Sequence, residues 1–106
     1  MLEQIIETIK QVTSLKPVVK GGNNNNPIEY LWYRTSYMGY RLVIEVHGSD
    51  ILKLTALNEK IVKAINDFGD NGKFNGSIDI NGGGTVTKDN KITMVSYFDV
   101  IDYSMK

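Results

Sequence analysis

The sequence predicts an α+β fold, with a mostly antiparallel sheet of about four to five strands and two helices packed on one face. Two segments repeat apolar residues at spacings of three and four, as amphipathic helices do, and several others have the alternation or aromatic content of strands. Asn-Gly and Gly-Gly pairs interrupt the second half of the chain, as tight turns do. The chain has 106 residues, 42% of them apolar, so we expect a single domain over residues 1–106 with one core.

The first predicted helix runs from residue 2 to about residue 14. Its apolar stripe consists of Leu2, Ile5, Ile6, Ile9 and Val12. Lys16-Pro17 is expected to end it, because proline disfavours helical geometry at the preceding residue. The following "VVK" is compatible with a short strand. The segment from Lys20 to Pro27 then contains two glycines and four asparagines, which offer too little apolar area for a core and must form a loop.

A β-hairpin and a second helix come next. The runs "IEYLWYRT" and "YRLVIEVHG" flank "SYMG" at 36–39, and the second run alternates apolar and polar residues. The helix is expected from about residue 50 to 68, with a cap at Ser49 or Asp50 and with Gly69 ending it in a left-handed conformation. Its apolar stripe consists of Leu54, Leu57, Ile61, Ala64, Ile65 and Phe68.

The last third of the chain predicts two or three more strands. "SIDI" and "TVT" are expected as short strands on either side of a flexible hairpin tip at Gly82, Gly83 and Gly84. "KDNK" at 88–91 turns the chain into a final strand, "ITMVSYFDVIDYS", which carries bulky residues on both faces. A strand of this kind is usually covered on both faces, so we expect helices on one side and a neighbouring subunit on the other.

Composition excludes several classes of function. Twelve basic and twelve acidic residues give a net charge of zero without a basic cluster, which argues against nucleic-acid binding. The absence of cysteine rules out disulfides, thiolate metal sites and a cysteine nucleophile, and fits a reducing cytoplasm. The N-terminus lacks the pattern of a signal peptide, and no window approaches the roughly 20 apolar residues of a membrane span. We expect no membrane partner.

Candidate catalytic motifs lack the context that their chemistry needs. His47 is the sole histidine and lies near Ser49 and Asp50, but three neighbours at a strand-to-helix turn do not readily converge as a triad. We therefore interpret His47 as a strand-end histidine beside a helix cap. "DFG" at 67–69 stands without the other kinase motifs. The triple glycine precedes strand residues instead of a helix, so it does not predict a phosphate loop.

Candidate metal and modification motifs are equally weak. "DFGDNG" at 67–72 approaches a calcium loop, but Gly69 takes its third position and Ile78 its twelfth, which disfavours a cation site at Asp67, Asp70 and Asp79. "NGS" at 75–77 matches a glycosylation sequon, which has no meaning without secretion. We expect no catalytic residue, cofactor or metal, and no enzymatic activity.

Aromatic residues gather around the predicted hairpin. They are Tyr30, Trp32, Tyr33, Tyr37 and Tyr40. Stacking on single-stranded bases needs a basic groove, and only Arg34 and Arg41 are near. We expect about half of these rings in the core and the rest at a protein interface, where Tyr and Trp are enriched.

From end to end, the order of elements resembles the small tail terminator (tail completion) proteins of tailed bacteriophages and prophages, which include minor capsid and tail-joining components. The resemblance rests on the N-terminal helix, the polar loop, "IEYLWYRT", "YRLVIEVHGSD" running into the helix that ends "IVKAINDF", the glycine-broken hairpin and "VSYFDVIDYS". It covers nearly the whole chain and includes no catalytic motif. It implies a structural protein that forms a hexameric ring, caps the tail tube and joins it to the head connector.

This resemblance implies the partners and the surface that binds them. The implied partners are other copies of the chain, the tail tube protein and the head connector protein, and the free chain is expected to be a monomer. The protein is expected first in the host cytoplasm and then in the virion. The expected interface residues are Asn23, Asn24, Asn25, Asn26, Trp32, Tyr33, Gly82, Gly83, Gly84 and Tyr97. Four consecutive asparagines are not a family signature. The alternatives are another head–tail joining or tail tube component, and a small non-enzymatic ligand-binding or regulatory α+β module.

Overall fold

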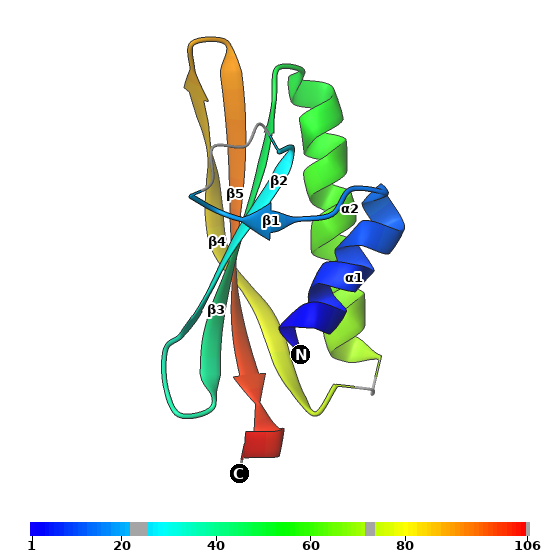
Figure 1. Cartoon of the computed structure of the whole chain (residues 1–106), viewed down its shortest axis with the longest axis vertical. Coiled ribbons are helices and arrows are strands. Elements are labelled where there is room, and N and C mark those ends of the chain that lie inside the picture. Colours follow the sequence, from blue (N-terminus) through cyan, green and yellow to red (C-terminus); the bar gives the residue numbers. More distant parts are fainter. Residues whose placement is uncertain (22–25, 72–73, 106) are drawn as a thin grey trace.

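Two helices cover one face of a five-stranded sheet in the computed structural model, which describes residues 1–21, 26–71 and 74–105 (Figure 1). The elements are α1 (Leu2–Thr13), β1 (Val18–Val19), β2 (Ile28–Arg34), β3 (Gly39–Gly48), α2 (Ile51–Asp70), β4 (Gly76–Lys88), β5 (Lys91–Asp102) and a 3₁₀ turn (Tyr103–Met105). The predicted α+β class is confirmed, including the short strand formed by "VVK" and the hairpin of β2 and β3.

The sheet has the strand order β1-β2-β3-β5-β4. Only the short pair of β1 and β2 is parallel, and the other three pairs are antiparallel. β3 and β5 pair over their full length, from Gly39 opposite Ile101 to Gly48 opposite Ile92. These two strands therefore form the centre of the sheet, and β4 is a long edge strand.

The core lies between the helices and one face of the central strands. Alternation along β3 turns Leu42, Ile44 and Val46 towards the helices, where all three are fully buried. The core also contains Ile5, Ile9, Ile28, Leu54, Ile61, Ile65, Ile78, Met94, Phe98 and Val100. The α2 stripe is confirmed. At the end of the α1 stripe, however, Val12 is 40% exposed, because α1 reaches the core with its first two turns.

The signals that end the two helices differ from the predicted ones. α1 ends at Thr13, close to the predicted residue 14, but ahead of Lys16-Pro17, because Ser14 adopts a left-handed conformation (φ 61°). α2 continues through Gly69 to Asp70, so the predicted left-handed stop at Gly69 is wrong. A Cβ at Gly69 would lie 3.2 Å from the Cβ of Ile78, so the glycine lets α2 approach β4 closely.

The predicted hairpin tip at the triple glycine is also wrong. Gly82, Gly83 and Gly84 lie inside β4, which is one continuous strand with a register shift between Ile80 and Gly83. Gly82 has a φ of 99°, and a Cβ at Gly83 would collide with the backbone oxygen of Val95. The glycines thus form a β-bulge. The turn itself lies at Asp89 and Asn90, whose φ angles of 52° and 65° suit a two-residue hairpin loop.

Candidate functional site

The face of the sheet that the helices leave uncovered, hereafter the open face, has an apolar stripe. The stripe consists of Leu31, Val43, Val86, Val95 and Tyr97, which share this face through the cross-strand register. Leu31 and Tyr97 flank Val43 in one row and are each 36% exposed, whereas Val43 is only 6% exposed. The stripe lines a broad depression of about 820 Å³. The open face is therefore both concave and partly apolar.

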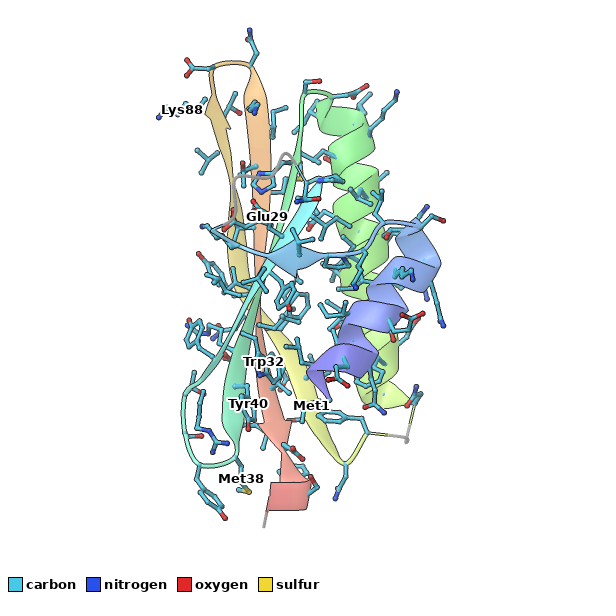
Figure 2. The ribbon with its side chains drawn as sticks, in the orientation of Figure 1. Met1, Glu29, Trp32, Met38, Tyr40 and Lys88 are labelled. Carbon is cyan, nitrogen blue, oxygen red and sulfur yellow. The ribbon has the colours of Figure 1, made fainter. Side chains whose placement is uncertain are left out.

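The predicted interface residues fall on different parts of the molecule. Tyr33 and Tyr97 lie on the open face. Trp32 points to the opposite face, where it packs against the core and stacks on Tyr40 with ring centroids 4.6 Å apart (Figure 2). Tyr30 also packs on the core, whereas Tyr33 and Tyr37 are exposed, so the expectation that about half of these rings lie in the core is confirmed.

The glycine and asparagine parts of the predicted interface have separate positions. Gly82, Gly83 and Gly84 lie on the edge strand β4, at the border of the open face. Asn26 lines a second depression, next to His47. Asn23, Asn24 and Asn25 lie outside the described residues.

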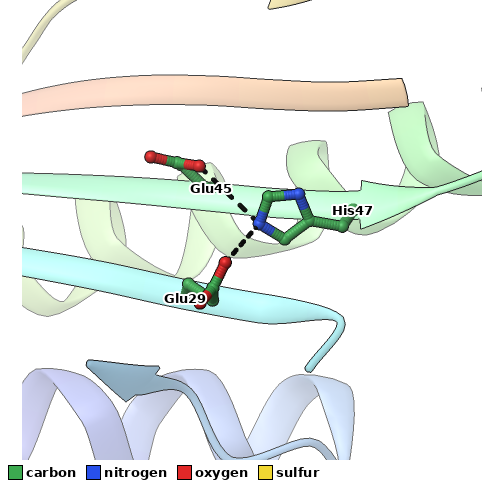
Figure 3. Close-up of side chains that lie close together, drawn as sticks. All are labelled: Glu29, Glu45 and His47. Atoms are coloured by element: carbon green, nitrogen blue, oxygen red, sulfur yellow. Dashed lines mark ion pairs between the residues drawn. The ribbon is translucent and has the colours of Figure 1, made fainter. Parts of the chain in front are cut away.

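A cluster of charged side chains interrupts the open face next to the apolar stripe. Glu29 of β2 and Glu45 of β3 are directly opposite each other, and like charges in this position are destabilising. Glu45 is nevertheless only 7% exposed. The ammonium group of Lys20 lies 2.5 Å from Glu45 Oε2, and His47 Nε2 lies 2.7 Å from Glu29 Oε1 and 3.6 Å from Glu45 Oε1 (Figure 3). The ammonium group of Lys20 thus offsets part of the repulsion between the glutamates.

The two ring nitrogens of His47 have different environments. Nδ1 lies 2.9 Å from the hydroxyl of Thr93, which β5 places beside His47. Nε2 is shielded from solvent and makes no hydrogen bond, although Glu29 Oε1 is at contact distance. A hydrogen on Nε2 would therefore be poorly aligned with that oxygen. The ring is fixed on one side, and its other nitrogen faces two carboxylates without a hydrogen bond.

Two basic residues that form ion pairs with carboxylates on the open face, Lys20 and Arg41, both have raised pKa values. The pKa of Lys20 is raised, first by its hydrogen bond to Glu45 and further by the charges of Glu45 and Glu29, against the opposing effect of burial. Elsewhere on the same face, Arg41 forms an ion pair with Asp99 at 3.0 Å. The hydrogen bond that Arg41 donates to Asp99 is the main cause that raises the pKa of Arg41. Charges of both signs therefore alternate across the open face.

Sequence reasoning did not single out Glu29 or Glu45. One available signal is the spacing of Glu45 and His47, which puts both on one face of a strand. The other signal is the short turn between the two predicted strands, because a short turn fixes the register of the hairpin, and this register pairs Glu29 with Glu45. Asp50 caps α2 as predicted, accepting from the backbone of Leu52 at 3.0 Å.

The aspartates of the candidate calcium loop do not gather in the part of the chain that the structure describes. Asp67 forms an ion pair with Lys63 at 2.7 Å within α2. Asp67, Asp70 and Asp79 are not among the described side chains that come close enough to share a cation.

Among residues 1–21, 26–71 and 74–105, no helix has the length and apolar character needed to cross a membrane. Comparison of the sequence with known proteins does not assign it to a family: no family model matches it, and no curated protein matches it significantly.

Proposed function

We propose that this chain is a structural assembly protein whose open sheet face docks against a neighbouring copy of the same chain. The observation that carries this proposal is the apolar stripe on the sheet face that α1 and α2, the two described α-helices, leave uncovered. An antiparallel sheet with one solvated face normally alternates polar residues outward. In this chain Leu31 on β2, and Val95 and Tyr97 on β5, take those outward positions on either side of β3.

The charge pattern favours a second copy over a nucleic acid. The chain has a net charge of zero, so two copies do not repel each other at long range. Lys20 and Arg41 are paired with Glu45 and Asp99. The other two lysines that line the depression, Lys88 and Lys91, flank Asp89, so its described lining carries both charges and not the basic surface that a phosphate backbone needs. Paired charges beside an apolar stripe are typical of protein interfaces with an apolar centre and a polar rim.

A second apolar surface supports a ring over a simple dimer. Ile51 and Leu52, at the start of α2, are exposed on the helix side of the molecule, away from the open face. Contacts between two different surfaces of identical subunits generate closed rings when the rotation closes. The open face of one copy and the surface around Ile51 and Leu52 of the next copy would form such a contact.

The specific form of assembly that we propose is a tail terminator ring. It rests on the order of elements, which resembles the phage and prophage tail terminators. In this role the protein would form a hexamer, bind the end of the tail tube and present a surface to the head connector. It would act in the host cytoplasm during assembly and remain in the virion.

Cysteine labelling tests whether the open face becomes covered. The chain has no cysteine, so Tyr97→Cys introduces a unique thiol on the open face. We expect a thiol reagent to label this variant several-fold more slowly as protein concentration rises. The matched control is Tyr37→Cys, whose side chain is exposed in the turn between β2 and β3. A labelling rate at residue 97 that is independent of concentration, in protein whose mass shows assembly, would place the interface elsewhere.

A tube-elongation assay tests the specific role. Tail tube protein encoded beside this chain should polymerise to shorter tubes in the presence of the wild-type protein, with the ring at one end. Tubes of unchanged length, without bound protein, would refute the terminator role while leaving self-assembly open to the labelling test.

A further inference from the structure

We propose that Glu29, Glu45 and His47 bind one divalent transition-metal ion of the Zn²⁺ class, through one oxygen of each carboxylate and through His47 Nε2. One possible ligand atom from each of these side chains lies within 4.8 Å of the other two. The inference does not depend on the proposed function, since it concerns one chain alone. It departs from the sequence expectation of no metal, because strand register is what brings the three side chains together.

The distances suit a shared metal ion. Zn²⁺ binds histidine nitrogen and carboxylate oxygen at about 2.0–2.2 Å, so ligands around one ion are separated by about 3.4 Å in tetrahedral geometry. Nε2 and Glu45 Oε1 are 3.6 Å apart, which fits this separation. Nε2 and Glu29 Oε1 are closer, at 2.7 Å, and a shift of less than about 1 Å in the Glu29 carboxylate would admit the ion.

The proton inventory of His47 also favours a cation at this position. If Nδ1–H donates to the Thr93 hydroxyl, Nε2 carries a lone pair that faces two carboxylate oxygens. That arrangement is repulsive unless a positive charge lies between the atoms. A proton on Nε2 serves poorly, because its N–H would miss Glu29 Oε1. A metal ion on the axis of the Nε2 lone pair does not need this alignment, because it can bind carboxylate oxygens that lie to the side of that axis.

The surroundings supply the features of a metal site beyond its ligands. Metal-binding histidines usually donate their other N–H to an oxygen that fixes the ring, as Thr93 does for His47. Lys20 contacts Oε2 of Glu45 and so leaves Oε1 free to face the imidazole. Asn26, Pro27 and Lys91 help line a depression of about 560 Å³ that reaches Glu29 and His47, through which an ion and a water ligand can enter.

The donor set indicates the class of metal. One imidazole with two carboxylates and an open position resembles the three-ligand sites that hold Zn²⁺ with a water. Mg²⁺ and Ca²⁺ prefer sites made of oxygen alone. Because His47 is the sole histidine and the chain lacks cysteine, binding of a nitrogen-preferring metal can be traced to one side chain.

Calorimetric titration of the untagged full chain with ZnCl₂ tests the proposal. We expect one Zn²⁺ per chain and an affinity at least about 100-fold lower in His47→Asn and in Glu45→Gln, since even second-shell changes cost 10–100-fold. Thr93→Val should weaken binding by about 10–100-fold through the ring orientation. The matched control is Asp99→Asn, which removes a carboxylate from the same face outside the cluster and should leave the affinity unchanged. MgCl₂ and CaCl₂ should bind more weakly than ZnCl₂.

Nitrogen NMR of the unmutated protein gives a readout that does not require a variant to fold. Zn²⁺ should shift the Nε2 resonance of His47 and leave Nδ1 protonated. The proposal is overturned if Zn²⁺ leaves both ring resonances unchanged, or if His47→Asn binds Zn²⁺ as tightly as the wild-type protein.

Discussion

Replacement of Lys20 by methionine tests whether this residue stabilises the charged cluster. Methionine keeps an unbranched apolar chain of similar length and removes the positive charge beside Glu45. Glu45 would then remain buried, directly opposite Glu29, with His47 as its nearest basic neighbour. Breaking a fully buried ion pair costs about 3–5 kcal/mol, and an exposed pair contributes about 0.2–1 kcal/mol.

The magnitude follows from the unequal exposure of the two partners. The side chain of Lys20 is 47% exposed and that of Glu45 is 9% exposed, so the pair lies between the two limits. We expect Lys20→Met to lower the free energy of unfolding by about 2 kcal/mol, which corresponds to about 10 °C in Tm for a domain of this size. Glu45→Gln in the Lys20→Met background should recover part of that loss, because it removes the unpaired charge.

Urea unfolding of the wild-type protein, both single variants and the double variant measures this coupling. A coupling energy of about 1–2 kcal/mol between Lys20 and Glu45 is expected from contact within one network. Because the pKa of Lys20 is raised in the folded protein, its contribution is fully present below about pH 10.4 and is lost as the pH rises through the higher folded value. Additive effects of the two substitutions, or a loss below about 0.5 kcal/mol in Lys20→Met, would refute this account of the cluster.

Two further predictions concern the bulge and the hairpin aromatics. Gly83→Ala should lower the free energy of unfolding by about 2 kcal/mol or more, because a Cβ would meet the backbone oxygen of Val95. Gly84→Ala, where a Cβ meets open space, should change it by less than about 1 kcal/mol. Equal effects of the two substitutions in urea unfolding would contradict the bulge. Trp32→Ala should lower the free energy of unfolding by about 2–4 kcal/mol and leave the assembly state of the folded protein unchanged. Tyr33→Ala should weaken assembly and lower the free energy of unfolding by less than about 1 kcal/mol. Thermal melts measure the stability and light scattering measures the assembly.

Local patterns were sufficient to predict most of the fold. The stripe of α2 and the alternation of β3 depend only on residues near one another in the chain, and the apolar faces they define form the core. The triple glycine failed as a predictor because an Asn-Gly pair suits a bulge as well as a turn. Gly69 failed because its role is contact with Ile78, which is distant in sequence and not visible from local chemistry.

The charged cluster could not be predicted by the same reasoning. Glu29 and Glu45 meet only because the β2–β3 register pairs them. Thr93, which contacts His47, lies on β5 and is 46 residues away from the histidine in the sequence. The neighbours of His47 therefore come from three strands, and their proximity depends on the register of the sheet and not on the sequence around the histidine. The open face was predicted in part, since both helices were expected on one face of the sheet. Bulky residues on both faces of β5 predict a second covering partner, which stays a prediction.

Light scattering of the purified protein over a concentration series, with and without tail tube protein, measures whether copies of this chain assemble. We expect a species of six times the 11.9 kDa chain at high concentration or beside tube protein. It also predicts that Tyr97→Glu remains folded and monomeric under the same conditions. A wild-type chain that stays monomeric throughout, with or without tube protein, would contradict the claim that a neighbouring copy covers the open face.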